Sequence, residues 1–207
     1  MSKKHRYLRE DESVSSPTVS LEGLFVTLVI DAYENRDVTT FDIPGAYFYA
    51  PNPADKQVLL NLKGLFVDIM CQVNPEYKRY VRIQRGQKVL YLLTLMAFYG
   101  YIKSDLLWYS LYTETLEEEG YKLNPYNYCI ANKTISYKQS TIAWYIAINK
   151  ASHVDPKVVD DLLKKIRPLF GEITVTRGKR HTFIGMDLRI VDPKLKVKIM
   201  YQFIENY

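Results

Sequence analysis

Two clusters of basic side chains are the first candidates for a chemical role. Arginine and lysine attract phosphate, and aromatic rings stack on bases, so basic residues interleaved with tyrosines are typical of grooves that bind nucleic acid. The alternative is that each cluster is a solvated basic loop. The candidate contacts are Lys78, Arg79, Arg82 and Arg85 in one segment and Arg177, Lys179 and Arg180 in another, with Tyr77, Tyr80 and Tyr101 as stacking partners.

The composition of the whole chain points the same way. The 207 residues include 18 tyrosines, and 28 Lys and Arg against 23 Asp and Glu give a net charge of +5. Nucleic acid is therefore the first partner to consider, although a tyrosine-rich core in a mildly basic protein is the plainer interpretation. Hydrophobic residues make up 47% of the chain and charged residues 25%, which is ordinary for a globular protein and excludes a disordered or collagen-like chain.

Metal, disulfide and membrane chemistry find little support. Cys71 and Cys129 are too few for a disulfide framework, and with three histidines far apart in sequence a Cys/His zinc site is not expected. No apolar run follows the basic start, and the most apolar stretches are shorter than the roughly 20 residues that cross a bilayer. We therefore expect a soluble, intracellular protein with no membrane span. The sequence does not identify its compartment, and an organelle is not excluded.

The elements that position these residues follow from hydrophobic periodicity and turn residues. Residues 1–16 predict a flexible arm carrying both basic and acidic side chains, and residues 17–207 a single domain. The first helix, from a cap at Ser16-Pro17 to Asn35, is apolar on several faces and should be deeply buried. Further helices are predicted over 65–73, over 104–119 and from Asp155 to a break at Pro168. Strands are predicted over 38–43 and 57–62, in hairpins over 81–93 (turning at Arg85-Gly86) and over 128–135 with 140–148, and over 173–176, 182–190 and 195–201. This order predicts an α+β fold with a largely antiparallel sheet.

Four segments, in this order, resemble the reverse transcriptase of copia-type retrotransposons. Val38-Thr-Thr-Phe-Asp-Ile-Pro-Gly-Ala-Tyr47 is similar to a strand and turn in which an aspartate precedes an aromatic residue by five positions. Phe98-Tyr-Gly-Tyr-Ile-Lys-Ser-Asp-Leu-Leu-Trp108 is similar to Leu-Tyr-Gly-x-x-Gln-x-x-x-x-Trp. Thr141-Ile-Ala-Trp-Tyr-Ile-Ala-Ile148 stands in place of a strand ending in Tyr-Val-Asp-Asp, and the weaker match, His181-Thr-Phe-Ile-Gly-Met186, is like Tyr-Phe-Leu-Gly-Ile.

The resemblance covers residues from about 16 to 190 and implies a polymerase palm with part of the fingers. In such a palm, a ferredoxin-like antiparallel sheet with packing helices carries the first aspartate on one strand and the Asp-Asp pair on an adjacent hairpin. A full thumb, an integrase and an RNase H are expected to lie outside this chain.

The resemblance also implies that polymerase chemistry is lost. Nucleotidyl transfer by two metal ions needs several converging carboxylates, because Mg²⁺ takes hard oxygen ligands. Asp42 stands at the first position, but Ala147 and Ile148 stand at the other two and offer no side-chain oxygen. We therefore expect a remnant acid, no two-metal site, no Mg²⁺ cofactor and no enzyme activity.

The nucleotide pocket of the family is altered as well. Tyr47 matches the aromatic residue that excludes a ribose 2′-hydroxyl, although it could equally pack against the palm. Lys103 and Asp105 replace the glutamine and proline that build the floor under the template base, and Tyr145 remains from the hairpin motif.

Three functions follow, in order of preference. The first is a catalytically inactive reverse-transcriptase-like protein that serves as a structural or protein-interaction subunit, with other protein subunits as partners. It is favoured because replacing two aspartates by Ala147 and Ile148 makes the hairpin turn apolar, as suits a buried contact. The alternative is a non-catalytic nucleic-acid-binding module, and an active RNA-directed DNA polymerase is third.

Overall fold

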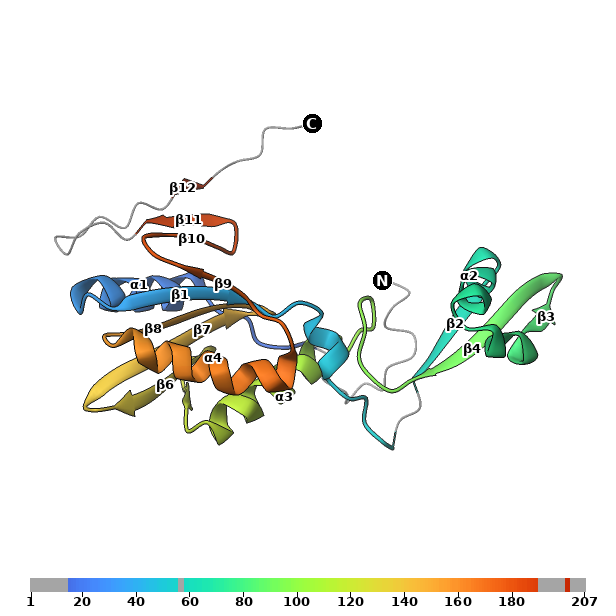
Figure 1. Ribbon diagram of the computed structural model, residues 1–207, viewed down its shortest axis with the longest axis horizontal. Coiled ribbons are helices and arrows are strands. Elements are labelled where there is room, and N and C mark those ends of the chain that lie inside the picture. Colours follow the sequence, from blue (N-terminus) through green and yellow to red (C-terminus); the bar gives the residue numbers. More distant parts are fainter. Residues whose placement is uncertain (1–14, 56–57, 190–199, 202–207) are drawn as a thin grey trace.

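The computed structural model describes residues 15–55, 58–189 and 200–201. The predicted arm therefore lies, up to residue 14, outside the described residues. The larger part of the molecule is a six-stranded antiparallel sheet, here called the palm sheet, with strand order β5-β6-β7-β8-β1-β9 (Figure 1). Its strands are Lys122–Asn124 (β5), Asn127–Ile135 (β6), Lys138–Tyr145 (β7), Ile148–His153 (β8), Asp37–Asp42 (β1) and Thr174–Arg177 (β9).

Four of these strands and two helices make the predicted ferredoxin-like unit. Along the chain β1 is followed by α3 (Ser104–Glu118), the β7–β8 hairpin, α4 (Pro156–Phe170) and β9. The strands lie in the order β7-β8-β1-β9, which is the split βαβ arrangement of a ferredoxin-like fold. The predicted α+β fold with a palm-like antiparallel sheet is confirmed.

Helices cover both faces of the palm sheet. Trp108 and Tyr112 of α3 pack on Phe170 of α4, with ring centroids 5.2 and 6.1 Å apart, and Tyr112 also meets Trp144 of β7 at 5.5 Å. The opposite face carries Lys150 and Ser152 of β8, whose side chains bind Asp31 of the first helix. The main hydrophobic core therefore lies between the sheet and α3 and α4.

The first helix, α1 (Leu21–Tyr33), differs from its prediction at the start and in burial. Its N-cap is Ser20, whose hydroxyl accepts from the Gly23 amide at 3.1 Å, so the helix begins after the predicted Ser16-Pro17 cap. Only one side is buried, and Val26 and Val29 are 59% and 52% exposed. The prediction of a deeply buried helix was wrong because an apolar residue on every face does not require a neighbour on every face.

Ion pairs fix α1 to the palm sheet. The Asp31 carboxylate accepts hydrogen bonds from Lys150 Nζ and, at 2.5 Å, from Ser152 Oγ, and Arg36 Nη1 lies 3.8 Å from it. The side chains of Asp31, Lys150 and Arg36 are at most 3% exposed. Such a buried cluster is stable only while every charge keeps its partner.

Three predicted elements were wrong in detail. The predicted strand over 140–148 ends at Tyr145, and β8 is a separate strand that periodicity did not reveal. Pro168 lies inside α4, two residues before its end, where the helix loses little by missing one amide. The predicted strand over 182–190 is a hairpin of β10 (Arg180–Phe183) and β11 (Met186–Arg189). The prediction over 195–201 lies mostly outside the described residues, and Met200–Tyr201 form β12 beside β11.

A smaller unit, residues 58–96, stands apart from the palm sheet (Figure 1) and is here called the fingers unit. It contains a sheet of order β2-β4-β3 and the predicted helix α2. The elements are Val58–Lys63 (β2), Leu65–Val73 (α2), Pro75–Tyr80 (a 3₁₀ helix), Arg82–Gln84 (β3) and Gln87–Thr94 (β4). Its own small core is Val67, Cys71 and Leu90.

Hydrogen bonds join the two chain segments that connect this unit to the palm sheet. Asn52 Nδ2 donates to the carbonyls of Thr94 and Met96 at 2.9 and 3.0 Å. The backbone amide of Asn52 donates to the Leu95 carbonyl at 2.9 Å. A short 3₁₀ helix, Ala46–Tyr49, precedes this crossing. Among the described residues no helix is long and apolar enough to cross a membrane.

Candidate functional site

Asp42 and the two positions that the resemblance marks as replaced, Ala147 and Ile148, lie side by side, as the resemblance implied. Strands β1 and β8 pair with Asp42 directly opposite Ile148. One residue further along, the Ile43 amide donates to the carbonyl of Ala147 at 3.2 Å. All three residues therefore lie at one end of the palm sheet.

The hairpin turn that carries Ala147 is held firmly and is not a free apolar surface. Ile146 has φ 54°, an unfavourable angle for a β-branched residue, and its carbonyl accepts from the Trp108 indole at 2.7 Å. Ile146, Ala147 and Ile148 are half-buried and pack against the main core. The core of the chain itself therefore covers part of this apolar turn, and the expected contact with another protein through it stays a prediction.

Asp42 offers a single carboxylate at this site. Burial raises the pKa of its carboxyl above the usual range, opposed by a hydrogen bond from the Ile43 amide. Within residues 15–55, 58–189 and 200–201 no three His, Cys, Asp or Glu side chains are grouped so that they could hold a metal ion. Asp187 does not join Asp42 but pairs with Arg180 and Arg189.

Among the residues that the resemblance assigns to a nucleotide pocket, Tyr47 and Asp105 contact each other. The Tyr47 hydroxyl donates a hydrogen bond to the Asp105 carboxylate, and the Tyr47 ring meets the edge of Tyr99 at 4.9 Å. Burial, and then the Asp105 carboxylate, raise the pKa of Tyr47 well above its ordinary value, with a smaller contribution from Tyr145. Lys103 occupies the N-cap position of α3, two residues before Asp105, but its side chain makes no capping hydrogen bond. The Tyr47 hydroxyl is thus committed to a side chain that the resemblance itself marks as a departure.

The predicted basic contacts near the last strands are largely neutralised. Arg177 forms salt bridges with Asp37 at 2.7 Å and with Asp160 at 2.5 Å. Arg180 forms a bidentate salt bridge with Asp187, with both N–O distances at 3.1 Å. Lys179 lies between these two arginines and is exposed. This segment therefore presents less positive charge to a phosphate than its composition suggests.

The other predicted cluster lies on the fingers unit and is exposed. Residues 58–96 hold six Lys or Arg and two Asp or Glu, hence a charge of +4 out of +5 for the chain. Arg79 pairs with Glu76 at 2.9 Å and lies over the Tyr80 ring at 4.9 Å. No ion pair in the described part of the chain engages the other members, which are Lys78, Arg82 and Arg85. Most of the protein's net charge is thus concentrated in less than a fifth of its length.

One face of the sheet of the fingers unit carries basic and aromatic side chains, a combination that the sequence reasoning missed. Register places Lys63 and Arg82 in one row, on either side of β4, on the face turned away from α2. Tyr91 stands in the next row of that face, 45% exposed, with its hydroxyl 3.2 Å from Gln84. Strand alternation in β4 was the available signal, because residues 89, 91 and 93 must share a face.

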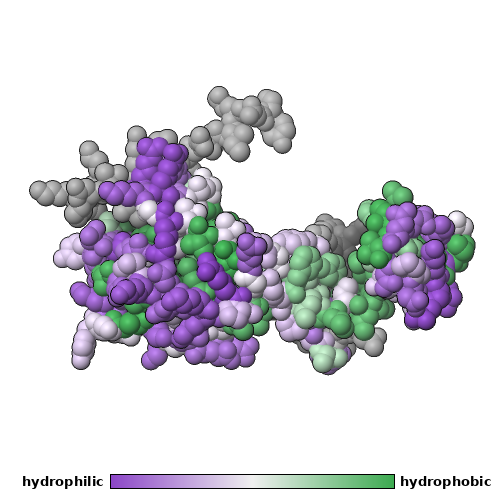
Figure 2. All heavy atoms as spheres, in the orientation of Figure 1, coloured by the Kyte–Doolittle hydropathy of each residue, from purple (hydrophilic) through white to green (hydrophobic). Residues whose placement is uncertain are grey.

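The outer side of α2 is a second surface that sequence reasoning missed. Leu65, Phe66, Ile69 and Val73 are 71%, 65%, 43% and 74% exposed, whereas Val67 and Cys71 face the small core. Figure 2 shows this hydrophobic surface in green on the fingers unit. Spacings of three and four residues place these four side chains on one stripe of the helix, here called the α2 stripe.

Comparison with known proteins gives distant likenesses. No family model and no curated protein matches the sequence. Apo telomerase from Candida tropicalis, truncated from its C-terminal domain, matches with a TM-score of 0.47 and 10% identity, over 87% of this chain and 40% of that chain. Telomerase from Candida albicans, in complex with a TWJ fragment of telomeric RNA, matches with a TM-score of 0.43 and 11% identity, over 87% and 35%. This chain spans two fifths or less of either telomerase chain, and likenesses this distant assign no family and no activity.

Proposed function

We propose that this protein is a catalytically inactive relative of reverse transcriptases, similar to those of copia-type retrotransposons, that serves as a structural or protein-interaction subunit of a larger assembly. Asp42 opposite Ile148 supports the loss of polymerase activity, since a reverse transcriptase needs three carboxylates at this end of the strand pair, and of these three positions only Asp42 carries one. The Tyr47–Asp105 contact supports it independently, because it occupies a hydroxyl of the nucleotide pocket.

The α2 stripe is the observation that carries the interaction role. Burying a leucine or phenylalanine side chain contributes about 1.5–3 kcal/mol, so four such side chains left in water are costly for an isolated monomer. Contiguous exposed apolar patches of this kind mark protein–protein contacts. We therefore propose the fingers unit, rather than the hairpin turn, as the interaction surface.

Native mass tests the interaction role. We expect the full chain, in extract of the cells it comes from, to elute in a complex of fixed stoichiometry. Phe66→Ser with Val73→Ser should shift it to the monomer mass, because both side chains are largely exposed and their loss spares the fold. Leu169→Ser, which removes an apolar residue 54% exposed on α4, is the matched control and should leave the complex intact. A monodisperse monomer for the unmodified chain would contradict the role.

The second candidate function is non-catalytic binding of single-stranded nucleic acid, favoured by the Lys63, Arg82 and Tyr91 face. Arginine and lysine neutralise phosphates, and the exposed Tyr91 in the neighbouring row can stack on a base. Sheets that display aromatic and basic side chains bind RNA in this way.

Titration of a primer–template and of single-stranded RNA at two salt concentrations tests this candidate. Affinity should fall steeply with salt, and Arg82→Gln should reduce the slope of log affinity against log salt by about 1. Tyr91→Ala should weaken binding about tenfold, as expected for loss of a stacked base. Arg180→Gln, whose charge is already balanced by Asp187, should change neither quantity. Absence of binding at low salt would end this candidate.

A further inference from the structure

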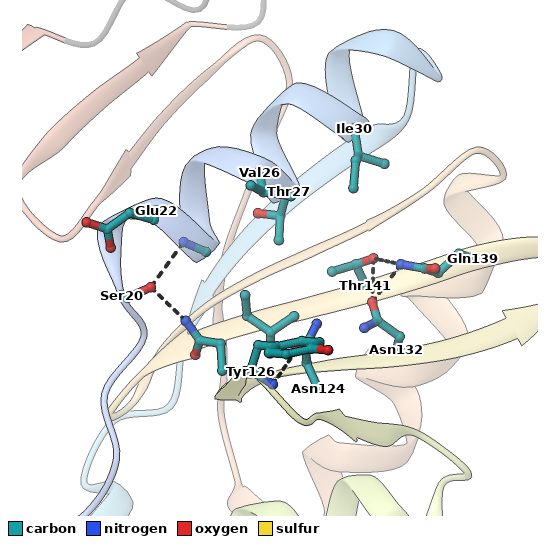
Figure 3. Close-up of a pocket in the computed structure, with 13 residues that line it drawn as sticks. Ser20, Glu22, Val26, Thr27, Ile30, Asn124, Tyr126, Asn132, Gln139 and Thr141 are labelled. Carbon is teal, nitrogen blue, oxygen red and sulfur yellow. Dashed lines mark hydrogen bonds between the residues drawn. The ribbon is translucent and has the colours of Figure 1, made fainter.

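A cavity lies beneath α1, on the palm sheet but away from Asp42 and its neighbours. Its volume is about 380 Å³, and it is bounded by α1 on one side and by β5, β6 and β7 on the other (Figure 3). Val26, Ile30 and Ile130 provide apolar walls. A cavity of this size suits a small molecule or one unit of a polymer.

Its floor is a closed hydrogen-bond network of three side chains. Gln139 Nε2 donates to Asn132 Oδ1 at 2.7 Å and to Thr141 Oγ1 at 3.0 Å, and Thr141 Oγ1 donates to Asn132 Oδ1 at 3.0 Å. Arg36 Nη1 also donates to Thr141 Oγ1, at 2.9 Å, and lies 3.8 Å from the Asp31 carboxylate. Arg36 therefore connects the floor of the cavity to the buried Asp31 cluster. The floor is therefore rigid before any ligand arrives, which lowers the entropic cost of binding.

This network dictates which groups remain for a ligand. Asn132 Oδ1 accepts two hydrogen bonds from the network. The side-chain amide of Asn132 is therefore oriented with its oxygen toward Gln139 and Thr141, and its Nδ2 group points elsewhere as a donor. Asn124 is fixed in the same sense, since its Oδ1 accepts from the Tyr126 amide at 2.9 Å. In the described ranges neither amide nitrogen has a hydrogen-bond acceptor. Two oriented donors therefore lie at one end of the cavity.

An aromatic ring stands beside these donors. Tyr126 is 96% exposed and lines the cavity together with Asn124 and Asn132 (Figure 3). An exposed tyrosine next to amide donors suits a flat ring that bears carbonyl oxygens, because the ring stacks while the carbonyls accept. The cavity lining has one charged residue, Glu22, and no cation, so the part of a ligand inside it is uncharged.

A cation lies just outside. A second hollow shares Asn124, Asn132 and Gln139 with the first and is also lined by Lys122 and Lys133. Lys122 is paired directly opposite Asn132 in the sheet, so the two side chains are neighbours on one face. Lys133 already donates to the Glu119 carbonyl at 2.5 Å, whereas Lys122 has no ion pair within the described residues. Lys122 is thus placed to meet an anion attached to a ring that rests on Tyr126.

We infer that this cavity binds a nucleoside monophosphate unit, either free or within a single strand, with the base beside Tyr126, Asn124 and Asn132 and the phosphate at Lys122. A base with ring carbonyls, such as uracil, is preferred to adenine, which has none. The inference is independent of the fingers unit and of the fate of the polymerase chemistry.

Titration of the full chain with uridine 5′-monophosphate, followed by calorimetry or ligand-observed NMR, tests the inference. Binding should be saturable, about tenfold weaker for adenosine 5′-monophosphate, and about tenfold weaker for uridine, which lacks the phosphate. A short oligouridine that binds more tightly than the monophosphate identifies a strand as the natural ligand, and one that fails to compete identifies a free nucleotide.

Variants at exposed or conservatively changed positions test the assigned contacts. Tyr126→Ala should weaken binding of the monophosphate about tenfold, and Tyr137→Ala, at an equally exposed tyrosine outside the cavity, should leave it unchanged. Asn132→Asp keeps the acceptor that holds the floor but removes the donor, and should abolish measurable binding. Lys122→Gln should bring the affinity of the monophosphate down to that of uridine. Lack of saturable binding, or equal effects of the two tyrosine variants, would overturn the inference.

Discussion

Replacing Asp31 by alanine should lower the free energy of unfolding by about 3–5 kcal/mol. The substitution leaves Lys150, which is 0% exposed, with a buried charge and no carboxylate, and it also removes the acceptor of Ser152. Urea denaturation of the full chain, followed by circular dichroism, measures the change. Asp161→Ala is the control, because its bridge to Lys164 joins side chains that are 67% and 72% exposed, and it should cost under about 1 kcal/mol.

A double variant separates charge burial from simple loss of packing. Asp31→Leu with Lys150→Met removes both charges and keeps similar volume, so it should be more stable than Asp31→Ala. This comparison also serves if the single variant does not fold, since recovery of the folded state by the double variant gives the same answer. If Asp31→Ala costs no more than Asp161→Ala, the cluster does not hold α1 on the sheet.

This cluster shows why some elements escaped prediction from sequence. The hairpin of β3 and β4 was predicted correctly because its turn residues, Arg85 and Gly86, are local and both adopt positive φ. Strand β8 was not, because Asn149, Lys150 and Ser152 interrupt any apolar alternation. Their burial depends on partners such as Asp31, which is 119 residues from Lys150. A strand of buried polar residues can be predicted only when the distant residues that pair with it are known.

The site divides in the same way. The place of Asp42 beside Ala147 and Ile148 could be predicted because the segments that carry them resemble, in order and spacing, those of a reverse transcriptase. The α2 stripe could not, since an apolar helix face predicts burial without saying what covers it. The cavity beneath α1 could not either, because asparagines and glutamine are frequent in hairpins. Only their hydrogen-bond directions make them donors toward a ligand.

Placing aspartates at Ala147 and Ile148, the two positions that the resemblance marks as replaced, should create a divalent-metal site without producing polymerisation. In the variant Ala147→Asp with Ile148→Asp, one new carboxylate stands directly opposite Asp42, where paired Cα atoms are about 4.5–5.5 Å apart. Three carboxylates at one sheet end satisfy a hard cation that one carboxylate does not. Mn²⁺ titration followed by electron paramagnetic resonance should show binding at least about tenfold tighter than in the unmodified chain. Primer extension should stay absent in both proteins, because Tyr47 remains bonded to Asp105.

A second pair of aspartates, Ser136→Asp with Tyr137→Asp, provides the matched control. It adds the same charge at the exposed turn between β6 and β7, where both residues have positive φ that aspartate tolerates. Because no acid of β1 faces that turn, its Mn²⁺ affinity should match that of the unmodified chain. Equal affinities in the two double variants would mean that nonspecific charge, and not the β1–β8 register, binds the metal. Mg²⁺-dependent extension by the unmodified chain would show instead that Asp42 finds other carboxylate partners, and the inactive assignment would fall. The comparison of the two double variants therefore tests whether the β1–β8 register alone can bring three carboxylates together around a metal ion.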